Sequence, residues 1–417
     1  MGQPTLVNSH FPVSAAAGAP RSLRLKYDVP LVLIVMALLV VGFLFVFSAS
    51  WQYASLRDEP STYLLVRQVV FAAIGSAIAV ALSLFDYHRY QRLLIPMVML
   101  ILAALVAVLI VKNEVNGNVR SLASGSIQPS EFAKLAIIIY LSFWLFAKSD
   151  VINNISFGLL PLTLILGIFM GLILGEPDIS AAATIFVLGG ALFFMAGGEF
   201  RQIVLVMVAA VLVGLVIVSV SHTGQQRMTD FFNGLQDPEK SSDHVLRSIE
   251  AIVRGGIFGV GIGRGVTKFT GLPVPWTDSI FAVITEETGF VGALGVIGLY
   301  IFFLWRGLLI ARKAPDMLGR LLASGITIWI TFEALINMGQ MVNLVPFAGN
   351  ALPLISYGGS NLVAVLAGIG ILMNVARSSE KAPAAPGERS YSAVVDLRRG
   401  DRRRRVSRPS GPEDAGE

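Results

Sequence analysis

Residues 29–49 read VPLVLIVMALLVVGFLFVFSA, an apolar stretch without a single charge. About 20 apolar residues are needed to cross the hydrocarbon core of a bilayer, so this stretch predicts a membrane-spanning helix. It is too long for the core of a cleavable signal peptide. The composition agrees, since 54% of the 417 residues are hydrophobic and only 14% are charged. So few charges could not cover the surface of a soluble protein of this size.

Further stretches of the same kind predict an all-α, polytopic membrane protein of about ten transmembrane helices. After the first, these are residues 64–84, 93–111, 132–146, 157–174, 179–196, 203–220, 280–305, 317–338 and 357–375. Lysine and arginine concentrate before the first stretch and in every second short connection, for example at Arg89, Lys148 and Arg306. Because basic loops remain in the cytoplasm, both termini are predicted to be cytoplasmic.

This topology divides the chain into three parts. Residues 1–28 form a cytoplasmic N-terminal segment, residues 29–376 form the membrane domain, and residues 377–417 form a cytoplasmic tail. The tail is rich in Pro, Ser, Gly and Arg, which predicts disorder. Its arginines either bind anionic lipid headgroups or only fix the topology. The longest extracytoplasmic loop, residues 221–279, precedes the eighth helix, and its residues 244–253 predict an amphipathic helix at the membrane interface.

One carboxylate stands out at the outer end of a predicted span. Asp278 precedes the 280–305 helix and follows Pro273 and Pro275, which disfavour helix upstream. The positive end of the helix favours the anionic form of Asp278. A carboxylate there could accept a proton from a sugar hydroxyl. A plain helix cap made by Thr277 or Asp278 explains the same residues.

Two other polar motifs begin spans. Glu131 and Lys134 are spaced i,i+3, which allows either a local ion pair or a cationic site for a phosphate. Glu176 and Asp178 flank a proline in a minimal turn. They could bind a divalent cation such as Mg²⁺ or Mn²⁺, or simply form a solvated turn. The chain has no cysteine, which excludes disulfides and thiolate ligands.

The segment 255–265 carries six glycines ahead of Asp278. Glycine allows close backbone approach to a ligand, and nearby basic residues, among them Lys268, favour an anionic one; a flexible connection is the alternative. Glu286 and Glu287 lie about two turns into the 280–305 helix. They are predicted to be buried partners of an Arg or Lys from another span.

Taken in order along the chain, these motifs resemble the SEDS family of shape, elongation, division and sporulation proteins. The resemblance is carried by Asn116-Gly117 with Arg120, Gln128-Pro129-Ser130-Glu131-Phe132-Ala133-Lys134, Glu176-Pro177-Asp178, Pro275-Trp276-Thr277-Asp278-Ser279-Ile280-Phe281-Ala282, Asn337-Met338-Gly339 and Leu352-Pro353 through Ser356-Tyr357-Gly358-Gly359-Ser360. Two departures are Trp276, where the family usually has His, and Ser121, where a Trp commonly follows the Arg. The N-terminal extension and basic tail favour the division branch over the elongation branch.

The resemblance implies a peptidoglycan glycosyltransferase that polymerises lipid II at the outer face of the bacterial cytoplasmic membrane, at the division septum. Asp278 would be the essential carboxylate, and the bundle would supply a groove for polyprenyl tails. Substrate-binding roles are predicted for Arg120, Gln128, Ser130, Glu131, Lys134, Arg227, Lys268, Thr277, Asn337, Ser356, Tyr357, Gly358, Gly359 and Ser360. The implied partners are lipid II, the nascent glycan strand, a class B penicillin-binding protein, other division proteins and membrane lipids, but no nucleic acid.

Two other functions remain open on the sequence. A flippase for the lipid-linked precursor also fits intramembrane charges, but it should need charged groups reachable from both faces and often shows an internal repeat, which is not evident here. A non-catalytic scaffold for a transpeptidase would be distinguished by an assay with lipid II in the presence and absence of the partner.

Overall fold

The computed structural model describes residues 27–111, 128–176 and 178–381 of the chain, and all its regular structure there is helical. The long helices are α1 (Val29–Leu56), α2 (Tyr63–Leu84), α3 (Leu94–Val111), α4 (Pro129–Ala147), α5 (Leu160–Gly175), α6 (Ile179–Met195), α7 (Phe200–Val220), α8 (His222–Gln236), α9 (Asp243–Gly255), α10 (Ile280–Arg312), α11 (Met317–Met341) and α12 (Gly359–Lys381). Short 3₁₀ helices are η1 (Tyr87–Leu93), η2 (Ser149–Val151), η4 (Pro238–Lys240) and η5 (Thr267–Phe269), and η3 (Ile155–Leu159) is a π-helical turn.

The chain is a multi-pass membrane protein. In the part that the structure describes, nine helices are long and apolar enough to cross a membrane, and α6 is a shorter apolar helix. Together they correspond to the predicted set of about ten, so the predicted fold class is confirmed. Some boundaries were wrong: α10 continues to Arg312, and α12 continues to Lys381, so residues 377–381 are helical. Residues 1–26 and 382–417 lie outside the described residues, and the predicted terminal segments stay predictions there.

Segments predicted to be cytoplasmic lie close to one another. Arg306 of α10 donates from Nε to Asp28 Oδ1 over 2.9 Å, just before α1 begins. His88 Nε2 lies 2.6 Å from Asp316 Oδ2, which joins the α2–α3 turn to the α10–α11 turn. These contacts gather one end of each of α1, α2, α3, α10 and α11 at the same end of the bundle. The arrangement agrees with the predicted topology, although which side faces the cytoplasm stays a prediction.

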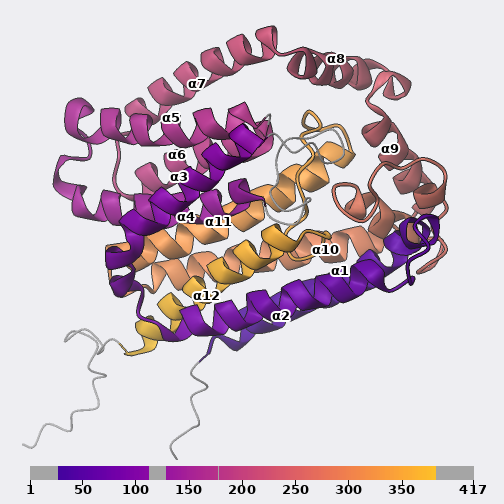
Figure 1. Ribbon diagram of the computed structural model, residues 1–417, viewed down its shortest axis with the longest axis horizontal. Helices are drawn as coiled ribbons and strands as arrows, with labels where there is room; N and C mark the ends of the chain where they lie inside the picture. Colours follow the sequence, from indigo (N-terminus) through magenta and orange to yellow (C-terminus); the bar gives the residue numbers. More distant parts are fainter. Residues whose placement is uncertain (1–26, 112–127, 177, 382–417) are drawn as a thin grey trace, which may run out of the picture. The chain divides into compact units, whose positions relative to one another are not determined.

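The core of the bundle is built around α10 and α11. Helix α10 packs against α1, α9 and α11, and α11 also packs against α4 and α6. In Figure 1, α10 and α11 run alongside α1 and α12. The largest fully buried side chains include Trp329, Tyr300 and Phe303, all from these two helices. Helix α7 is the opposite case, since none of its apolar window is buried and its main contacts are with α6 and α8.

The predicted loop 221–279 is largely folded. It contains α8, α9 and the turns η4 and η5. Helix α9 includes the predicted amphipathic segment 244–253, and it buries Val245, Ser248 and Ala251. Because α9 contacts α10 and α11, its apolar face packs against the bundle and is not available for the membrane interface. This folded connection brings α8 and α9 to the outer end of α10.

Helix α10 is kinked at Gly289, where φ is 73°. The kink interrupts the intrahelical ladder, and the glycine-rich segment supplies partners for the released groups. Val260 N–H donates to the Glu286 carbonyl over 3.0 Å, and Phe290 N–H donates to the Gly256 carbonyl over 2.9 Å. The segment therefore pairs with the kinked helix through its backbone.

Two glycines make this pairing possible. A Cβ on Gly255 would clash with the Thr285 carbonyl, and a Cβ on Gly259 would clash with the Glu287 carbonyl. Gly259 also has φ of 78°, a conformation that glycine adopts readily. The close backbone approach predicted for this segment is thus real, but it is made to α10. The prediction that the glycines approach an anionic ligand is not supported.

Candidate active site

A polar cavity of about 660 Å³ lies at the end of the bundle where α10 and α12 begin, between α1, α2, α4, α8, α9 and the segments before α10 and α12. It brings together many residues that the sequence singled out: Gln128, Glu131, Lys134, Asp178, Arg227, Thr277, Asp278, Tyr357, Gly358, Gly359 and Ser360. The sequence missed other lining residues, among them Tyr53, Arg57, Tyr63, Arg67, His244, Glu333 and Phe347. Motifs separated by more than 200 residues thus form one site.

Asp278 is half-buried in the wall of this cavity. Its backbone carbonyl accepts a hydrogen bond from Asn337 Nδ2 over 2.9 Å. A Cβ on Gly349 would lie 3.3 Å from Asp278 Oδ2, so the backbone before α12 passes directly beside the carboxylate. Helix α10 begins after Ser279, which occupies the cap position. The alternative that Thr277 or Asp278 serves as the helix cap was therefore wrong.

The backbone on the N-terminal side of Asp278 is also fixed. Ser356 Oγ donates to the Thr277 carbonyl over 2.6 Å, and Tyr357 N–H donates to the Trp276 carbonyl over 2.9 Å. Both donors come from the segment before α12. Together with the bond from Asn337, these contacts hold the backbone of Trp276, Thr277 and Asp278 in place. They therefore fix the position of the Asp278 Cα. Such preorganisation is what a catalytic group needs.

Asn337 and Ser356 do not line the cavity. Asn337 is fully buried, and its Nδ2 also donates to the Asn350 carbonyl over 2.7 Å. Ser356 accepts from Leu352 N–H over 2.7 Å. Their side chains are engaged with the backbone, so the substrate-binding role predicted for both is replaced by a positioning role.

The N-terminus of α4 is joined to the N-terminus of α12 across the cavity. Gln128 N–H donates to Ser360 Oγ over 2.9 Å. Asn361 Nδ2 donates to Glu131 Oε2 over 2.8 Å. These bonds explain why two motifs that are far apart in the sequence both carry short polar side chains. They also fix the distance between two walls of the cavity.

Lys134 forms an ion pair with two carboxylates. Its Nζ lies 2.7 Å from Glu131 Oε2 and also contacts Glu333 Oε1 of α11. The predicted local pair is present, but Glu333 adds a second negative charge. Lys134 is therefore compensated twice and is not the isolated cation that a phosphate site would need. A lone glutamate inside the apolar 317–338 stretch was the signal that could have revealed Glu333.

Asp178 caps α6 and holds the start of α4. Its Oδ1 accepts from Ala181 N–H over 3.1 Å, and its Oδ2 accepts from Gln128 Nε2 and Ser130 Oγ, both over 3.2 Å. These donors occupy the lone pairs that a divalent cation would use, so Asp178 does not fit the predicted metal site. Glu176 is fully buried nearby. The described ranges contain no group of three or more His, Asp and Glu side chains arranged to hold a metal.

Lys268 lies away from the cavity. Its Nζ donates to Glu287 Oε1 over 2.6 Å and to Ser48 Oγ over 2.8 Å, and the lysine is only 4% exposed. Glu286 accepts from the Thr267 hydroxyl over 2.9 Å. Glu287 has a buried basic partner as predicted, but this lysine comes from the connection before α10 and not from another span. Glu286 is satisfied by uncharged donors. The substrate-binding role predicted for Lys268 is not supported, because the ion pair separates it from the cavity.

Helices α8 and α9 add Arg227 and His244 to the lining. The His244 ring stacks on Phe347 with centroids 4.1 Å apart. Burial, together with the charge of Arg227, lowers the pKa of His244 to about 4. The imidazole is therefore neutral near pH 7 and offers the cavity an uncharged hydrogen-bonding group. Arg120, the remaining predicted basic residue, lies outside the described residues.

Aromatic and basic side chains from α1 and α2 form the opposite wall. The rings of Tyr53 and Trp276 have centroids 4.7 Å apart, and the Arg57 guanidinium lies 4.5 Å from the Tyr53 centroid. Arg67 NH1 donates to Tyr63 OH over 3.1 Å. The arginines of the described lining thus come from α8 and from the α1–α2 region, whereas most of its carboxylates belong to α4, α6 and α11.

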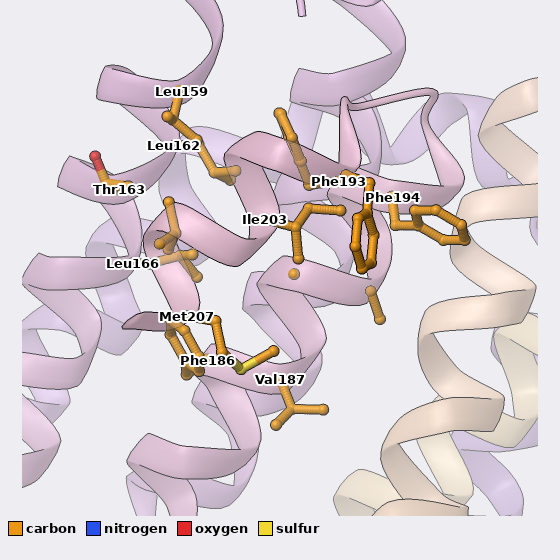
Figure 2. A pocket seen from close by; sticks show the side chains of 14 residues that line it. Leu159, Leu162, Thr163, Leu166, Phe186, Val187, Phe193, Phe194, Ile203 and Met207 are labelled. Carbon is orange, nitrogen blue, oxygen red and sulfur yellow. The ribbon is translucent and has the colours of Figure 1, made fainter. Parts of the chain in front are cut away.

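A second cavity, of about 330 Å³, lies between α5, α6 and α7. Figure 2 shows the side chains around it, including Phe186, Phe193, Phe194, Ile203 and Met207. All its described lining residues are apolar except Thr163. This cavity suits a hydrocarbon chain, and it offers no group for proton transfer. The polar cavity is therefore the candidate active site.

The chain matches the family model of the cell cycle proteins FtsW, RodA and SpoVE over residues 29–381. The chain belongs to this family. It is 37% identical to the probable peptidoglycan glycosyltransferase FtsW of Trichlorobacter lovleyi, over 86% of this chain and 95% of the relative. It is 34% identical to the stage V sporulation protein E of Bacillus subtilis, over 84% and 97% of the two chains.

Solved structures of the FtsW, RodA and SpoVE family share the fold. A chain from a peptidoglycan synthase complex that coordinates polymerisation and crosslinking matches with a TM-score of 0.70 and 28% identity, over 86% of this chain and all of that one. The rod shape determining protein RodA of Thermus thermophilus matches with a TM-score of 0.62 and 28% identity, over 85% and 98% of the two chains. The resemblance drawn from the motifs is thereby confirmed.

Proposed function

We propose that this protein is a peptidoglycan glycosyltransferase that polymerises lipid II into glycan strands. One observation supports this most: Asp278 lines a polar cavity at the outer end of the bundle, together with Arg57, Arg67 and Arg227. A carboxylate that can accept a proton and nearby cations for a diphosphate are what glycosyl transfer from a lipid diphosphate requires. The names of the relatives add to this support.

The proposed reaction joins a growing glycan strand, carried on a lipid diphosphate, to a lipid II acceptor. Asp278 accepts the proton of the acceptor's 4-hydroxyl while that oxygen attacks the anomeric carbon of the donor. The bond from this carbon to the diphosphate breaks, and the configuration inverts. The diphosphate leaves with the electron pair, stabilised by the arginines of the cavity. The proton remains on the Asp278 carboxyl until solvent accepts it.

Fixing the backbone of Trp276, Thr277 and Asp278 contributes to the reaction by holding the base at the cavity wall. Asp178 does not act as a metal ligand in the proposed reaction, because its carboxylate already accepts hydrogen bonds from Gln128, Ser130 and Ala181. A divalent cation stays a proposed cofactor whose ligands would come from other groups, including the substrate diphosphate.

The decisive experiment is polymerisation of purified lipid II by the Asp278→Asn variant. We expect loss of polymer, since the amide cannot accept the proton, with an unchanged unfolding midpoint. Asp237→Asn is the matched control, because Asp237 lies in the same 221–279 connection, outside the cavity lining, and pairs with Lys240. Full activity in Asp278→Asn would overturn the proposal.

We further propose that the protein acts in the cytoplasmic membrane at the division septum, with a class B penicillin-binding protein and other division proteins. Support comes from the FtsW relatives and from the solved synthase complex that matches this chain. Comparing lipid II polymerisation with and without the purified transpeptidase tests the partnership. Activity in the absence of the transpeptidase would also exclude a purely scaffolding role.

A further inference from the structure

The proposed reaction leaves one feature of the cavity without a role, namely the stacked side chains on the α1 side. Trp276 precedes Asp278 by two residues, and its carbonyl is held by Tyr357 N–H. Two residues span at most about 7 Å, so the Cα atoms of Trp276 and Asp278 lie within that distance of each other. Both Trp276 and Tyr53 line the cavity and are half-buried.

Three side chains contact one another in turn, and we call them the aromatic platform: Trp276, Tyr53 and Arg57. The Trp276 and Tyr53 rings are tilted by 54° with centroids 4.7 Å apart. The Arg57 guanidinium lies 4.5 Å from the Tyr53 centroid, within the range of a cation–π interaction. The backbone of Trp276 is thus held in place, and the Tyr53 ring contacts both an indole and a guanidinium. Rings ordered in advance bind a ligand with little further loss of entropy.

The chemistry of the platform distinguishes among the parts of a lipid-linked saccharide. A pyranose ring has a face of C–H bonds and a rim of hydroxyls, so it can lie against an aromatic ring while its rim binds polar groups. A diphosphate has no apolar face, and a polyprenyl chain has no rim for polar groups. The neighbouring wall offers Arg67 and Tyr63 for such a rim.

We propose that the aromatic platform binds the sugar ring of the acceptor and presents its hydroxyl to Asp278. This inference rests on the proposed function and names the part of the substrate that this wall recognises. Arg57 orders Tyr53, and Trp276 makes the ring contact. The platform acts on substrate binding, whereas Asp278 acts on the chemical step, so the two can be separated by experiment.

The test uses binding in the Asp278→Asn background, where lipid II is not consumed. We expect intrinsic tryptophan fluorescence to change on titration with lipid II, and not with a polyprenyl diphosphate that lacks sugars. In a Trp276→Phe variant of this background the change should disappear. Trp51→Phe is the matched control, since Trp51 lies on α1 near Tyr53, packs against Phe269 and does not line the cavity. There the change should persist.

A kinetic comparison tests the same platform. In the otherwise native enzyme, Trp276→Leu should raise KM for lipid II roughly three- to tenfold with kcat little changed, and Trp276→Phe should restore most of the affinity.

A fluorescence change that persists in Trp276→Phe, or one produced equally by the sugar-free lipid, overturns the platform. An unaltered KM in a folded Trp276→Leu variant does the same. If Asp278→Asn binds no lipid II, measured by copurification, both proposals fail together; if it binds but the platform variants behave as wild type, only the platform fails.

Discussion

Lys134 and Lys268, the two buried lysines among the described residues, lie in different surroundings, although the sequence predicted a substrate-binding role for both. Lys134 is paired with Glu131 and Glu333 in the wall of the cavity. Lys268 is paired with Glu287 beneath the glycine-rich segment, outside the cavity. Both lysines are almost completely buried. Burial of a charge therefore does not distinguish a candidate functional site from a structural ion pair. The distinguishing feature is whether the charge lines a cavity.

The surroundings explain the difference. The contacts around Lys268 join different parts of the protein to one another. Its partner Glu287 also accepts a hydrogen bond from Ser48 Oγ, and another from Gly263 N–H over 2.8 Å. This network ties α1 and α10 to the segment that precedes Asp278. Lys134 has one positive charge for two carboxylates, which is an imbalance that a substrate in the cavity would experience. We expect loss of Lys268 to lower stability first, and loss of Lys134 to lower activity first.

The largest effect on stability is expected for Lys268→Met. The substitution leaves the Glu287 carboxylate buried without its cation, which costs about 3–5 kcal/mol of unfolding free energy. Denaturant unfolding in detergent measures this loss. The double variant Lys268→Met, Glu287→Gln should recover most of the stability, since the amide still bonds Ser48 and no buried charge remains. A single variant as stable as wild type would remove the distinction between the two lysines.

Lys134→Met should affect activity more than stability. Lys134 is the only basic residue that α4, α6 and α11 contribute to the described cavity lining, so its loss leaves Glu131, Asp178 and Glu333 facing an anionic substrate. We expect kcat/KM for lipid II to fall roughly 10²-fold, on the scale of removing one stabilising group from an active site. Because Glu131 and Glu333 line the cavity, water that enters it can reach them, which limits the loss of stability.

The double variant Lys134→Met, Glu333→Gln sharpens this contrast. It should restore stability and leave polymerisation low, because the cation is still missing. The matched double variant Lys268→Met, Glu287→Gln should have nearly native stability and nearly native polymerisation activity. If polymerisation also recovers in the Lys134 double variant, Lys134 is a structural ion pair like Lys268, and the contrast between the two lysines is wrong.

The smallest effect is expected for Asp178→Asn. Asparagine keeps one oxygen for the cap of α6 and loses a charged acceptor for Gln128 and Ser130, which costs about 1 kcal/mol. The concentration of Mg²⁺ or Mn²⁺ that supports half-maximal polymerisation after chelation should not change. A tenfold or larger increase in that concentration would make Asp178 a metal ligand, contrary to its bonding here.

Most of the fold could be predicted from the sequence, because a membrane-spanning helix satisfies its own backbone and needs only length and apolar composition. The 280–305 prediction found the start of α10 at Ile280. Its end was missed because Arg306 bonds Asp28 and helix continues past the apolar stretch. The 221–279 connection was predicted only in part, since α8 and α9 depend on contacts with the bundle.

For the site, the motifs identified Asp278, Lys134 and the Gly358–Ser360 segment as neighbours of the reaction, and all of them line one cavity. The same motifs could not separate Asn337 and Ser356, which hold the backbone, from residues that face the substrate. Tyr53 and Arg57 carry no motif at all, and only their position opposite Trp276 makes them part of the site.

By itself, the sequence determined that this chain crosses the membrane many times and that one carboxylate, Asp278, stands just before a helix. Those properties are local: they depend on apolar length and on the prolines and helix dipole next to a single residue. Only the tertiary structure decided which charges meet a cavity and which are sealed in pairs. A charge in a low-dielectric interior is governed by the partners within a few ångströms, and in this protein those partners come from distant helices.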